Sequence, residues 1–407
     1  MSADNNYGFA TKLVHAGEAP DPLTGAIAPV LVRTKTFSQP VFGVESKWQY
    51  SRGKNPTRSI LELKLEALAG GGQATVFGSG DAATTMFLLT LKPGDRLVCC
   101  KELYGGTIRL FEQLFKDFGI HADYVDVQDL AAVKAVQTDR TVAIWTESPT
   151  NPKLGIIDLH KVGEVAKATG LRFIADLTFA PPVTTDPFAY GAETVIYSLS
   201  KYFAGHNDVI GGAVVTKNKE LYDRLVWLQW SVGAVLSPDE CYRVIQELKT
   251  LGMRWERVSA SAQIVAEHLQ KHPQITKVYY PGLDDHPGRD IAIKQMKNGF
   301  GAALSFDLRS ADLHLIRQFV NSLQTSQLVV FGESLASPET ILAHPATMSH
   351  RSLTTEQRND LGIHDNFFRL SVGFEEPNDL IKVLDEALAI FNTNNVAVET
   401  NAATVAN

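Results

Sequence analysis

Short apolar segments alternate with segments of helical or loop character through the first half of the chain. The apolar segments are rich in β-branched residues and lie at residues 96–100, 141–148, 171–176, 194–199 and 211–216. Residues 158–168, just before Gly170, have the spacing of an intervening helix. This alternation predicts an α/β fold, with a mostly parallel sheet covered by helices on both faces. In such sheets ligands bind at the carboxyl ends of the strands.

Two helices are predicted near the start of this region. Leu61, Leu65 and Leu68 recur at helical spacing between Asn55-Pro56 and the glycines at 70–72, which are typical cap, start and stop signals. Residues 74–91 (ATVFGSGDAATTMFLLTL) then read as a strand, a glycine turn and a second helix. A turn of this kind can offer free backbone N–H groups to a phosphate, although such turns more often simply connect elements.

The pattern changes near Pro238, where long helical stretches begin. Residues 239–272 are helical in character, residues 301–308 form an apolar strand, and residues 378–391 have the pattern of a closing helix. We therefore predict a large domain at 51–245 and a smaller α/β domain at 246–392. Residues 393–407 are small and polar, and are predicted to be a frayed tail.

Composition excludes several classes of function. The 407-residue chain has a formal net charge of −7 and no basic run, which argues against nucleic-acid or anionic-lipid partners. No apolar run approaches the ~18 residues of a membrane span, and the first residues lack a signal-peptide pattern, so a cytoplasmic enzyme is expected. Cys99, Cys100 and Cys241 have neither metal-ligand nor disulfide spacing, and we expect buried thiols and no metal site.

A lysine after an apolar strand is the strongest chemical signal. Lys201 lies in SLSKYFAGHNDVIGG, close to Ser198 and Ser200, where a solvated surface lysine would be out of place. A buried lysine loses its proton readily and can form a Schiff base with an aldehyde. Pyridoxal phosphate is the aldehyde cofactor that this setting suggests.

The other requirements of that cofactor also have candidates. The backbone N–H groups of Gly80 and Asp81, with the two serine hydroxyls, could hold a phosphate. Asp176, at a strand end, could pair with a protonated ring nitrogen, and Tyr104 could stack on the ring. Taken singly, Asp176 could cap a turn and Tyr104 could be a core aromatic. Their joint occurrence in this order favours a cofactor site.

Seven stretches, in the same order, carry a resemblance to a known family. The chain resembles the cysteine and methionine metabolism family of pyridoxal phosphate enzymes, which includes cystathionine γ-lyase, γ-synthase and β-lyase and methionine γ-lyase. The similarity runs from about Thr11 to Phe391 through DPLTGAIAPVLVRTKTF, YSRGKNPTRSILE, YGGTIR, ESPTNP, SLSKYFAGHNDVIGG, ESLASPETILAHPATMSH and RLSVGFE. It implies the aspartate aminotransferase fold type I, and a homotetramer of dimers that share active sites.

The resemblance also implies roles for cofactor-binding residues. Lys201 matches the Schiff-base lysine that moves protons, Tyr104 the stacking tyrosine and Asp176 the partner of the ring nitrogen. Asn151 matches a residue near the ring hydroxyl. Tyr50 and Arg52 match residues that reach the phosphate of a neighbouring subunit, so residues 1–50 are expected to form an arm to that subunit.

For the substrate, the resemblance implies a carboxylate grip and a distal contact. Arg369 and Ser334 match the pair that binds the α-carboxylate, for which a guanidinium is well suited. Arg109 matches an arginine close to the distal end of the substrate.

Departures from the family pattern point to a specialised member. Leu177 replaces an asparagine beside the expected cofactor site, and Asp81 replaces a methionine or leucine. An aspartate suits a helix start but adds negative charge near a phosphate. The lysine motif reads Ser-Leu-Ser-Lys instead of Ser-Ala-Thr-Lys, which keeps both hydroxyls.

Glu333 and Gly106 favour one branch of the family. An acidic residue at 333 resembles the γ-lyases and γ-synthases, unless it is merely a solvated loop charge, and methionine γ-lyase has cysteine at the position of Gly106. We expect γ-elimination or γ-replacement on an L-homoserine- or cystathionine-like amino acid. The alternatives are β-elimination of cystathionine or cystine, methionine γ-lyase-type activity, γ-replacement with an unusual nucleophile, and a catalytically silent scaffold.

Overall fold

The computed structural model describes residues 7–351 and 353–392, so the predicted tail at 393–407 lies outside the described residues. Within them, no helix is both long enough and apolar enough to cross a membrane. Cys99, Cys100 and Cys241 are buried and free, as expected. The same residues contain no cluster of acidic, histidine and cysteine side chains suited to a metal ion.

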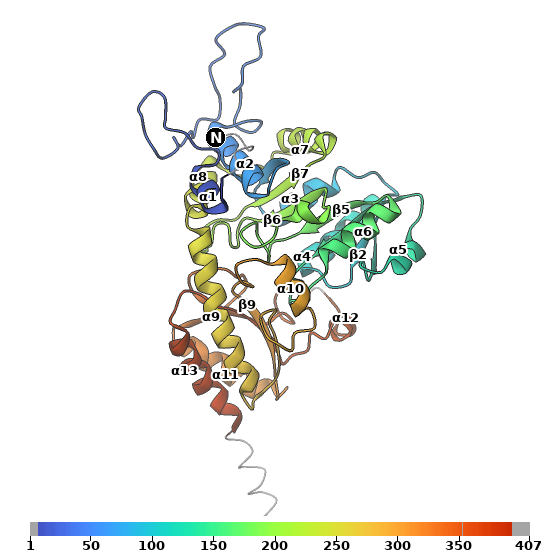
Figure 1. Cartoon of the computed structure of the whole chain (residues 1–407), viewed down its shortest axis with the longest axis vertical. Helices are drawn as coiled ribbons and strands as arrows, with labels where there is room; N and C mark the ends of the chain where they lie inside the picture. Colours follow the sequence, from blue (N-terminus) through green and yellow to red (C-terminus); the bar gives the residue numbers. More distant parts are fainter. Residues whose placement is uncertain (1–6, 352, 393–407) are drawn as a thin grey trace, which may run out of the picture.

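A seven-stranded sheet forms the larger part of the molecule (Figure 1). Its strands, in spatial order, are β1 (Gln73–Phe77), β7 (Gly212–Thr216), β6 (Thr194–Ser198), β5 (Arg172–Asp176), β4 (Thr141–Glu147), β2 (Arg96–Cys100) and β3 (His121–Val125). All neighbours from β6 to β3 are parallel, whereas β7 is antiparallel to both β6 and β1. The predicted mostly parallel sheet is confirmed. The edge strand β3 was not anticipated.

Helices cover this sheet and complete its core. They are α2 (Pro56–Leu68), α3 (Gly80–Leu88), α4 (Gly105–Arg109), α5 (Leu130–Val136), α6 (Leu159–Thr169) and α7 (Lys219–Val232). The predicted signals of α2 are all in place: Asn55 Oδ1 accepts hydrogen bonds from the N–H groups of Thr57 and Arg58, at 2.9 and 3.3 Å, and Pro56 is the first helical residue. Its leucine stripe, including Leu61 and Leu65, is buried against the sheet.

A second sheet has a core of its own. The predicted helical stretch is divided into α8 (Pro238–Leu248) and α9 (Leu251–Lys271), and α9 runs from the larger sheet to the smaller one (Figure 1). The strand order is β10 (Val329–Phe331), β11 (Thr340–Ala343), β12 (Phe367–Ser371), β9 (Ala303–Leu308) and β8 (Ile275–Tyr279). The remaining helices of this part are α10 (Arg289–Gln295), α11 (Leu313–Thr325), α12 (Thr355–Asp360) and α13 (Pro377–Leu388).

The sequence predicted a larger and a smaller α/β part, and the structure has one sheet in each. Phe306, Phe319 and Phe368 pack together in the core of the smaller sheet, whereas the larger sheet has a separate apolar cluster. The closing helix begins at Pro377 and is followed by a 3-10 turn to Asn392. The residue boundaries proposed for the domains stay predictions.

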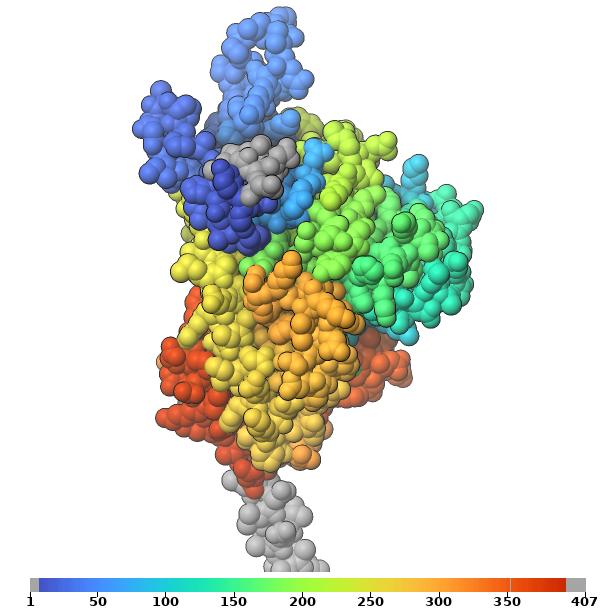
Figure 2. Space-filling view, in the orientation of Figure 1, coloured from blue at the N-terminus to red at the C-terminus, as the bar shows by residue number. Residues whose placement is uncertain are grey.

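The segment between α1 (Phe9–His15) and α2 projects from this body. Figure 1 shows its blue loops extending away from the helices and sheets, and in Figure 2 the same blue segments protrude from the rest of the molecule. Several apolar side chains in it have almost no cover: Leu23 is 91% exposed, Ile27 is 85% exposed and Phe42 is fully exposed. Such an uncovered apolar surface is typical of an interaction site.

Candidate active site

A cavity of about 460 Å³ lies where β5, β6 and the start of α3 meet the loop before β11. It is therefore at the carboxyl ends of parallel strands, as the fold class predicts. Most of the residues predicted from the sequence line it, namely Gly80, Asp81, Tyr104, Asn151, Asp176, Ser198, Ser200, Lys201, Glu333, Ser334 and Arg369. Tyr50, Arg52 and Arg109 are not among the lining residues.

Lys201 follows β6 and extends its amine into this cavity. Its Nζ donates a hydrogen bond to Ser334 Oγ at 2.9 Å. Burial, followed by the nearby Arg369 charge, lowers the pKa of Lys201 to about 8. About a tenth of this amine is therefore neutral at pH 7, far more than for an ordinary lysine, and the neutral form is the one that attacks a carbonyl.

Asp176, the last residue of β5, is a buried carboxyl group with no cation beside it among the described residues. Its Oδ1 accepts a hydrogen bond from the Thr178 N–H at 3.0 Å. Burial raises the pKa of Asp176 to about 6. A buried acid without a charged partner is costly, so the arrangement suits a ligand that brings a positive group.

The start of α3 has free backbone donors. Ser79 Oγ accepts a hydrogen bond from the Ala82 N–H at 2.9 Å, whereas Gly80 and Asp81 occupy the first helical turn, where N–H groups have no partner within the helix. A Cβ on Gly80 would lie 3.0 Å from Ser198 Cβ, so glycine leaves room for a ligand close to the backbone. Helix N-termini of this kind bind phosphate.

The serine hydroxyls differ in what they can offer to such a phosphate. Ser198 Oγ lies beside Gly80, at 3.2 Å from the position of an added Cβ. Ser200 Oγ donates to the Gly211 carbonyl at 3.3 Å and accepts from the Gly211 N–H at 3.0 Å. Ser200 thus fixes the turn after β6, and the Ser198 hydroxyl is the one more available to bind a phosphate.

Arg369, on β12, is a buried cation in the wall of the same cavity. Its Nη1 donates to Asn151 Oδ1 at 2.7 Å and its Nη2 donates to the Ser334 carbonyl at 3.0 Å. The side chain is buried, its Nε has no hydrogen-bond partner, and no carboxylate of the described residues lies within ion-pair distance. A buried guanidinium oriented by neutral groups is a ready carboxylate site.

Ser334 has an unusual backbone conformation. Its φ is 110°, in a region that residues other than glycine rarely adopt. The Arg369 bond to its carbonyl and the Lys201 bond to its hydroxyl hold it there. Strain of this kind persists where neighbouring contacts impose it, and here it keeps the loop before β11 over the lysine.

Tyr104 depends on the two glycines that follow it. A Cβ on Gly106 would lie 2.3 Å from the Tyr104 ring, and a Cβ on Gly105 would lie 2.1 Å from the Ser349 carbonyl. The Tyr104 N–H donates to Glu147 Oε2 at 2.8 Å. Gly106, which the sequence suggested as a marker of the reaction type, is therefore required by the position of the ring.

Two of the departures from the family pattern, Leu177 and Asp81, lie in different places. Leu177 is fully buried in the core of the larger sheet and does not line the cavity. Asp81 does line it, and its Oδ2 lies 3.3 Å from Arg109 Nη2. Asp81 thus links Arg109 to the cavity wall, and it is the departure that can affect a ligand.

Several lining residues were missed by the sequence reasoning. Glu147, Thr178, Phe179 and Ser349 all line the cavity. Glu147 is buried, and burial, followed by the neighbouring Asp176, raises its pKa well above the ordinary value. Glu147 and Ser349 lie inside motifs that had been recognised, ESPTNP and HPATMSH, so a signal for them was present.

Comparison with known proteins identifies the family. Residues 10–389 match the family described as Cys/Met metabolism PLP-dependent enzyme. The chain belongs to this family. It is 42% identical to a cystathionine β-lyase of Coxiella burnetii over 95% of this chain and all of that protein. It is 40% identical to a cystathionine γ-synthase of Mycobacterium bovis over 94% of this chain and 97% of that protein.

A solved structure agrees over almost the whole fold. The crystal structure of cystathionine γ-lyase from Lactobacillus plantarum complexed with L-serine superposes with a TM-score of 0.89 at 38% identity, covering 94% of this chain and 99% of that chain. The predicted fold class is confirmed. The protein is a pyridoxal phosphate enzyme of cysteine and methionine metabolism, of the carbon–sulfur lyase or transferase type.

The cavity fits this cofactor by its own chemistry. It presents a partly neutral amine, a buried acid without a cation and a helix start with free N–H groups. These groups complement an aldehyde, a protonated pyridine ring and a phosphate, respectively.

Proposed function

We propose that the protein catalyses γ-elimination or γ-replacement on an L-homoserine- or cystathionine-like amino acid. The observation that carries the proposal is that the amine of Lys201, the buried cation Arg369 and the buried acid Asp176 line one cavity. Neither Arg369 nor Asp176 forms an ion pair with another of the described residues. Glu333 adds an acidic group to the same wall.

The cofactor would be held at both ends. Lys201 would bond to its aldehyde, Asp176 to its ring nitrogen, and the Gly80 and Asp81 N–H groups with Ser198 to its phosphate. Tyr104 would stack on the ring. When bound, the cofactor withdraws electrons from the carbon atoms of the attached amino acid.

Lys201 would then move the protons. Its amine, once released by the substrate, is kept near its reacting position by the 2.9 Å bond to Ser334 Oγ. Because burial holds the pKa of Lys201 near 8, the amine can take a proton from the substrate Cα and return it to another carbon.

Arg369 would orient the substrate. Its two bonds, to Asn151 and to the Ser334 carbonyl, fix the plane of the guanidinium before any substrate arrives. An α-carboxylate bound there places Cα on the side of Lys201. Pre-fixed positioning of this kind lowers the entropic cost of reaching the reactive geometry.

Glu333 supports the choice of reaction at the γ-carbon. Its charge acts on both Lys201 and Tyr104, which means that the carboxylate lies near the groups expected around the substrate. A carboxylate there can attract the ammonium group at the distal end of a cystathionine-like substrate.

β-Elimination of cystathionine is the second candidate, because the relative from Coxiella burnetii is named a cystathionine β-lyase. The test is product analysis after incubation with L-cystathionine. Release of 2-oxobutanoate supports the γ reaction, whereas release of pyruvate contradicts it and supports the β reaction. O-acetyl-L-homoserine with L-cysteine then separates γ-elimination from γ-replacement, which forms cystathionine.

We also propose that the active unit is a homotetramer in which Tyr50 and Arg52 serve a neighbouring subunit. Two features support this: the exposed apolar side chains of the projecting segment, and the position of Tyr50 and Arg52 outside their own cavity. The expected cytoplasmic location stays a prediction.

A further inference from the structure

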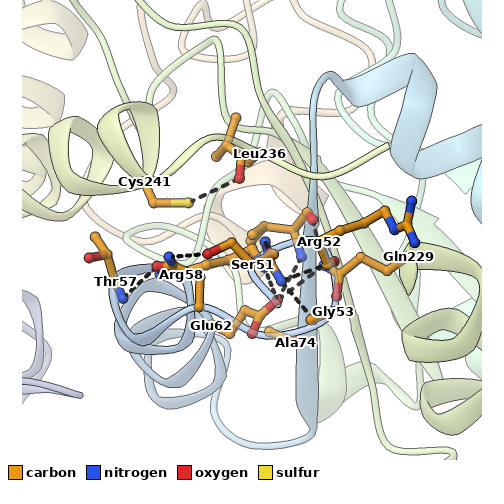
Figure 3. Close-up of polar contacts among 12 residues, drawn as sticks. Ser51, Arg52, Gly53, Thr57, Arg58, Glu62, Ala74, Gln229, Leu236 and Cys241 are labelled. Carbon is orange, nitrogen blue, oxygen red and sulfur yellow. Dashed lines mark hydrogen bonds and ion pairs between the residues drawn. The ribbon is translucent and has the colours of Figure 1, made fainter. Parts of the chain in front are cut away.

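One buried arginine holds the backbone of residues 50–53. Arg58, on α2, is 1% exposed. Its Nη1 donates to the Ser51 carbonyl at 2.8 Å, and its Nη2 donates to the carbonyls of Gly53 and Arg52 at 2.6 and 3.3 Å. Figure 3 shows this guanidinium among the carbonyl groups of the loop. Three successive carbonyl groups therefore accept hydrogen bonds from one guanidinium, which fixes the course of the chain.

Trp230, on α7, holds the side chains of the same loop. The Tyr50 ring lies edge-on to it, with ring centroids 6.2 Å apart, and the Arg52 guanidinium lies 5.2 Å from its ring centroid. A Cβ on Gly53 would come within 2.1 Å of the Trp230 ring. The loop thus passes so close to the indole that glycine is required at 53.

The helices that carry Arg58 and Trp230 are hydrogen-bonded to β1, the strand that leads to the cavity. Glu62 Oε1 accepts hydrogen bonds from the Val76 N–H and from Gln229 Nε2, both at 3.3 Å, and lies 3.9 Å from Arg58 Nε. Gln229 also donates to the Val76 carbonyl at 2.8 Å. Gln229 is the neighbour of Trp230 in α7, so helices α2 and α7 and strand β1 form one support for the loop (Figure 3).

Arg52 itself is left without a charged partner. Its guanidinium contacts the rings of Tyr50 and Trp230, at 5.4 and 5.2 Å, but forms no ion pair or hydrogen bond with the described residues. A guanidinium held against aromatic rings, on a backbone that cannot shift, is prepared to bind an anion.

We propose that Trp230, together with Arg58, is a positioning residue that presents Arg52 to the cofactor phosphate of a neighbouring subunit. The proposal rests on the proposed function in one respect, namely that Arg52 binds this phosphate. Trp230 acts through Arg52 and does not contact the cofactor itself.

The test compares variants of the full-length protein in their affinity for pyridoxal phosphate, measured by titrating the apoprotein and following the visible absorption band. Trp230→Leu is expected to raise the dissociation constant about tenfold, since a charged contact with phosphate is weakened. Trp227→Leu is the matched control. It changes an exposed tryptophan of the same helix that contacts Arg224 instead of the loop, and is expected to change the constant less than about twofold.

A double variant shows whether Trp230 acts through Arg52. Arg52→Gln alone is expected to weaken cofactor binding at least as much as Trp230→Leu, and the double variant is expected to be no weaker than Arg52→Gln. The mass of the assembly, measured by light scattering, should be unchanged in Trp230→Leu, which separates a positioning effect from a loss of assembly.

Two results would overturn the proposal. If Trp230→Leu binds cofactor as the native protein does, or if its effect adds in full to that of Arg52→Gln, Trp230 does not position Arg52. If Arg52→Gln itself leaves the affinity unchanged, Arg52 does not bind the phosphate. This outcome overturns the assigned role of Arg52 and differs from a failure of Trp230 alone.

Discussion

At the residue scale, the cavity contains charges that the chain itself does not neutralise. Arg369 is buried with neutral partners, and Asp176 is buried with a backbone N–H as its partner. Burying unpaired charges costs several kcal/mol per group in the ligand-free protein. The cost is offset when the cofactor brings a positive ring nitrogen to Asp176 and the substrate brings a carboxylate to Arg369. The two residues therefore favour ligands that carry these charges.

The first prediction concerns the pH dependence of cofactor loading. The neutral amine of Lys201 is the nucleophile, and burial lowers its pKa to about 8, so the rate of loading into the apoprotein should rise with pH to a midpoint near 8. Stopped-flow absorbance measures this rate. A midpoint near the ordinary value of 10.5 would show that the amine is not desolvated in the cavity.

The second prediction concerns the pair of Asp81 and Arg109. Removing the carboxylate in Asp81→Leu or Asp81→Asn leaves Arg109 uncompensated, so turnover of a substrate whose acyl group carries a free carboxylate should increase. Both side chains are nearly half exposed, which screens the charge and limits the gain to a few-fold. The measurement is the ratio of kcat/KM for O-succinyl-L-homoserine to that for O-acetyl-L-homoserine. An unchanged ratio in both variants would remove Asp81 from substrate selection.

At the scale of elements, α2 supports the loop of residues 50–53 through Glu62, whose side chain is 17% exposed. Burial raises the pKa of Glu62 from 4.5 to about 7 in the folded protein. The folded state therefore holds this proton more tightly than the unfolded chain. The resulting stabilisation is complete below pH 4.5 and is lost as pH rises through about 7.

The third prediction follows for Glu62→Gln. Its amide oxygen can still accept the bonds from Val76 and Gln229, but it does not titrate. The melting temperature of the variant should fall less than that of the native protein between about pH 4.5 and 7. Differential scanning calorimetry across this range measures the difference. Parallel curves for the two proteins would mean that Glu62 is not desolvated.

Individual elements show how far the sequence could predict the structure. Helix α2 has a cap, a proline start and a leucine stripe, so local signals were sufficient. The edge strand β3 was missed, because its residues HADYV are all partly exposed and lack a continuous apolar run. Thr250, the residue before α9, makes no side-chain cap hydrogen bond, so the break between α8 and α9 had no clear local signal.

The site follows the same distinction between local and distant signals. Lys201 and Asp176 end or follow apolar strands, so their position at one edge of the sheet could be argued from the chain alone. Ser334 is 133 residues from Lys201, and Arg369 is 218 residues from Asn151. Such pairings depend on tertiary packing. The family resemblance assigned these residues to one site, but it did not predict these hydrogen bonds. The link between Asp81 and Arg109 was not predicted at all.

At the scale of the whole molecule, the projecting segment predicts assembly. Leu23 and Ile27 are 91% and 85% exposed in the single chain. The fourth prediction is that Leu23→Ser/Ile27→Ser lowers the mass of the assembly measured by light scattering, because apolar contact with another subunit is lost. Ile293→Ser, an exposed apolar position on α10, is the control and should leave the mass unchanged. Equal masses for all three proteins would exclude these side chains from the interface.

The central claim is that Lys201 bonds to pyridoxal phosphate within the cavity that Asp176 and Arg369 also line. The most direct test is borohydride reduction of the native holoenzyme, followed by peptide mass mapping. The account predicts a phosphopyridoxyl group on the peptide that contains Lys201, and none on that peptide in Lys201→Ala. A label on a different lysine of the native enzyme, or no label in protein that carries the cofactor, would contradict it.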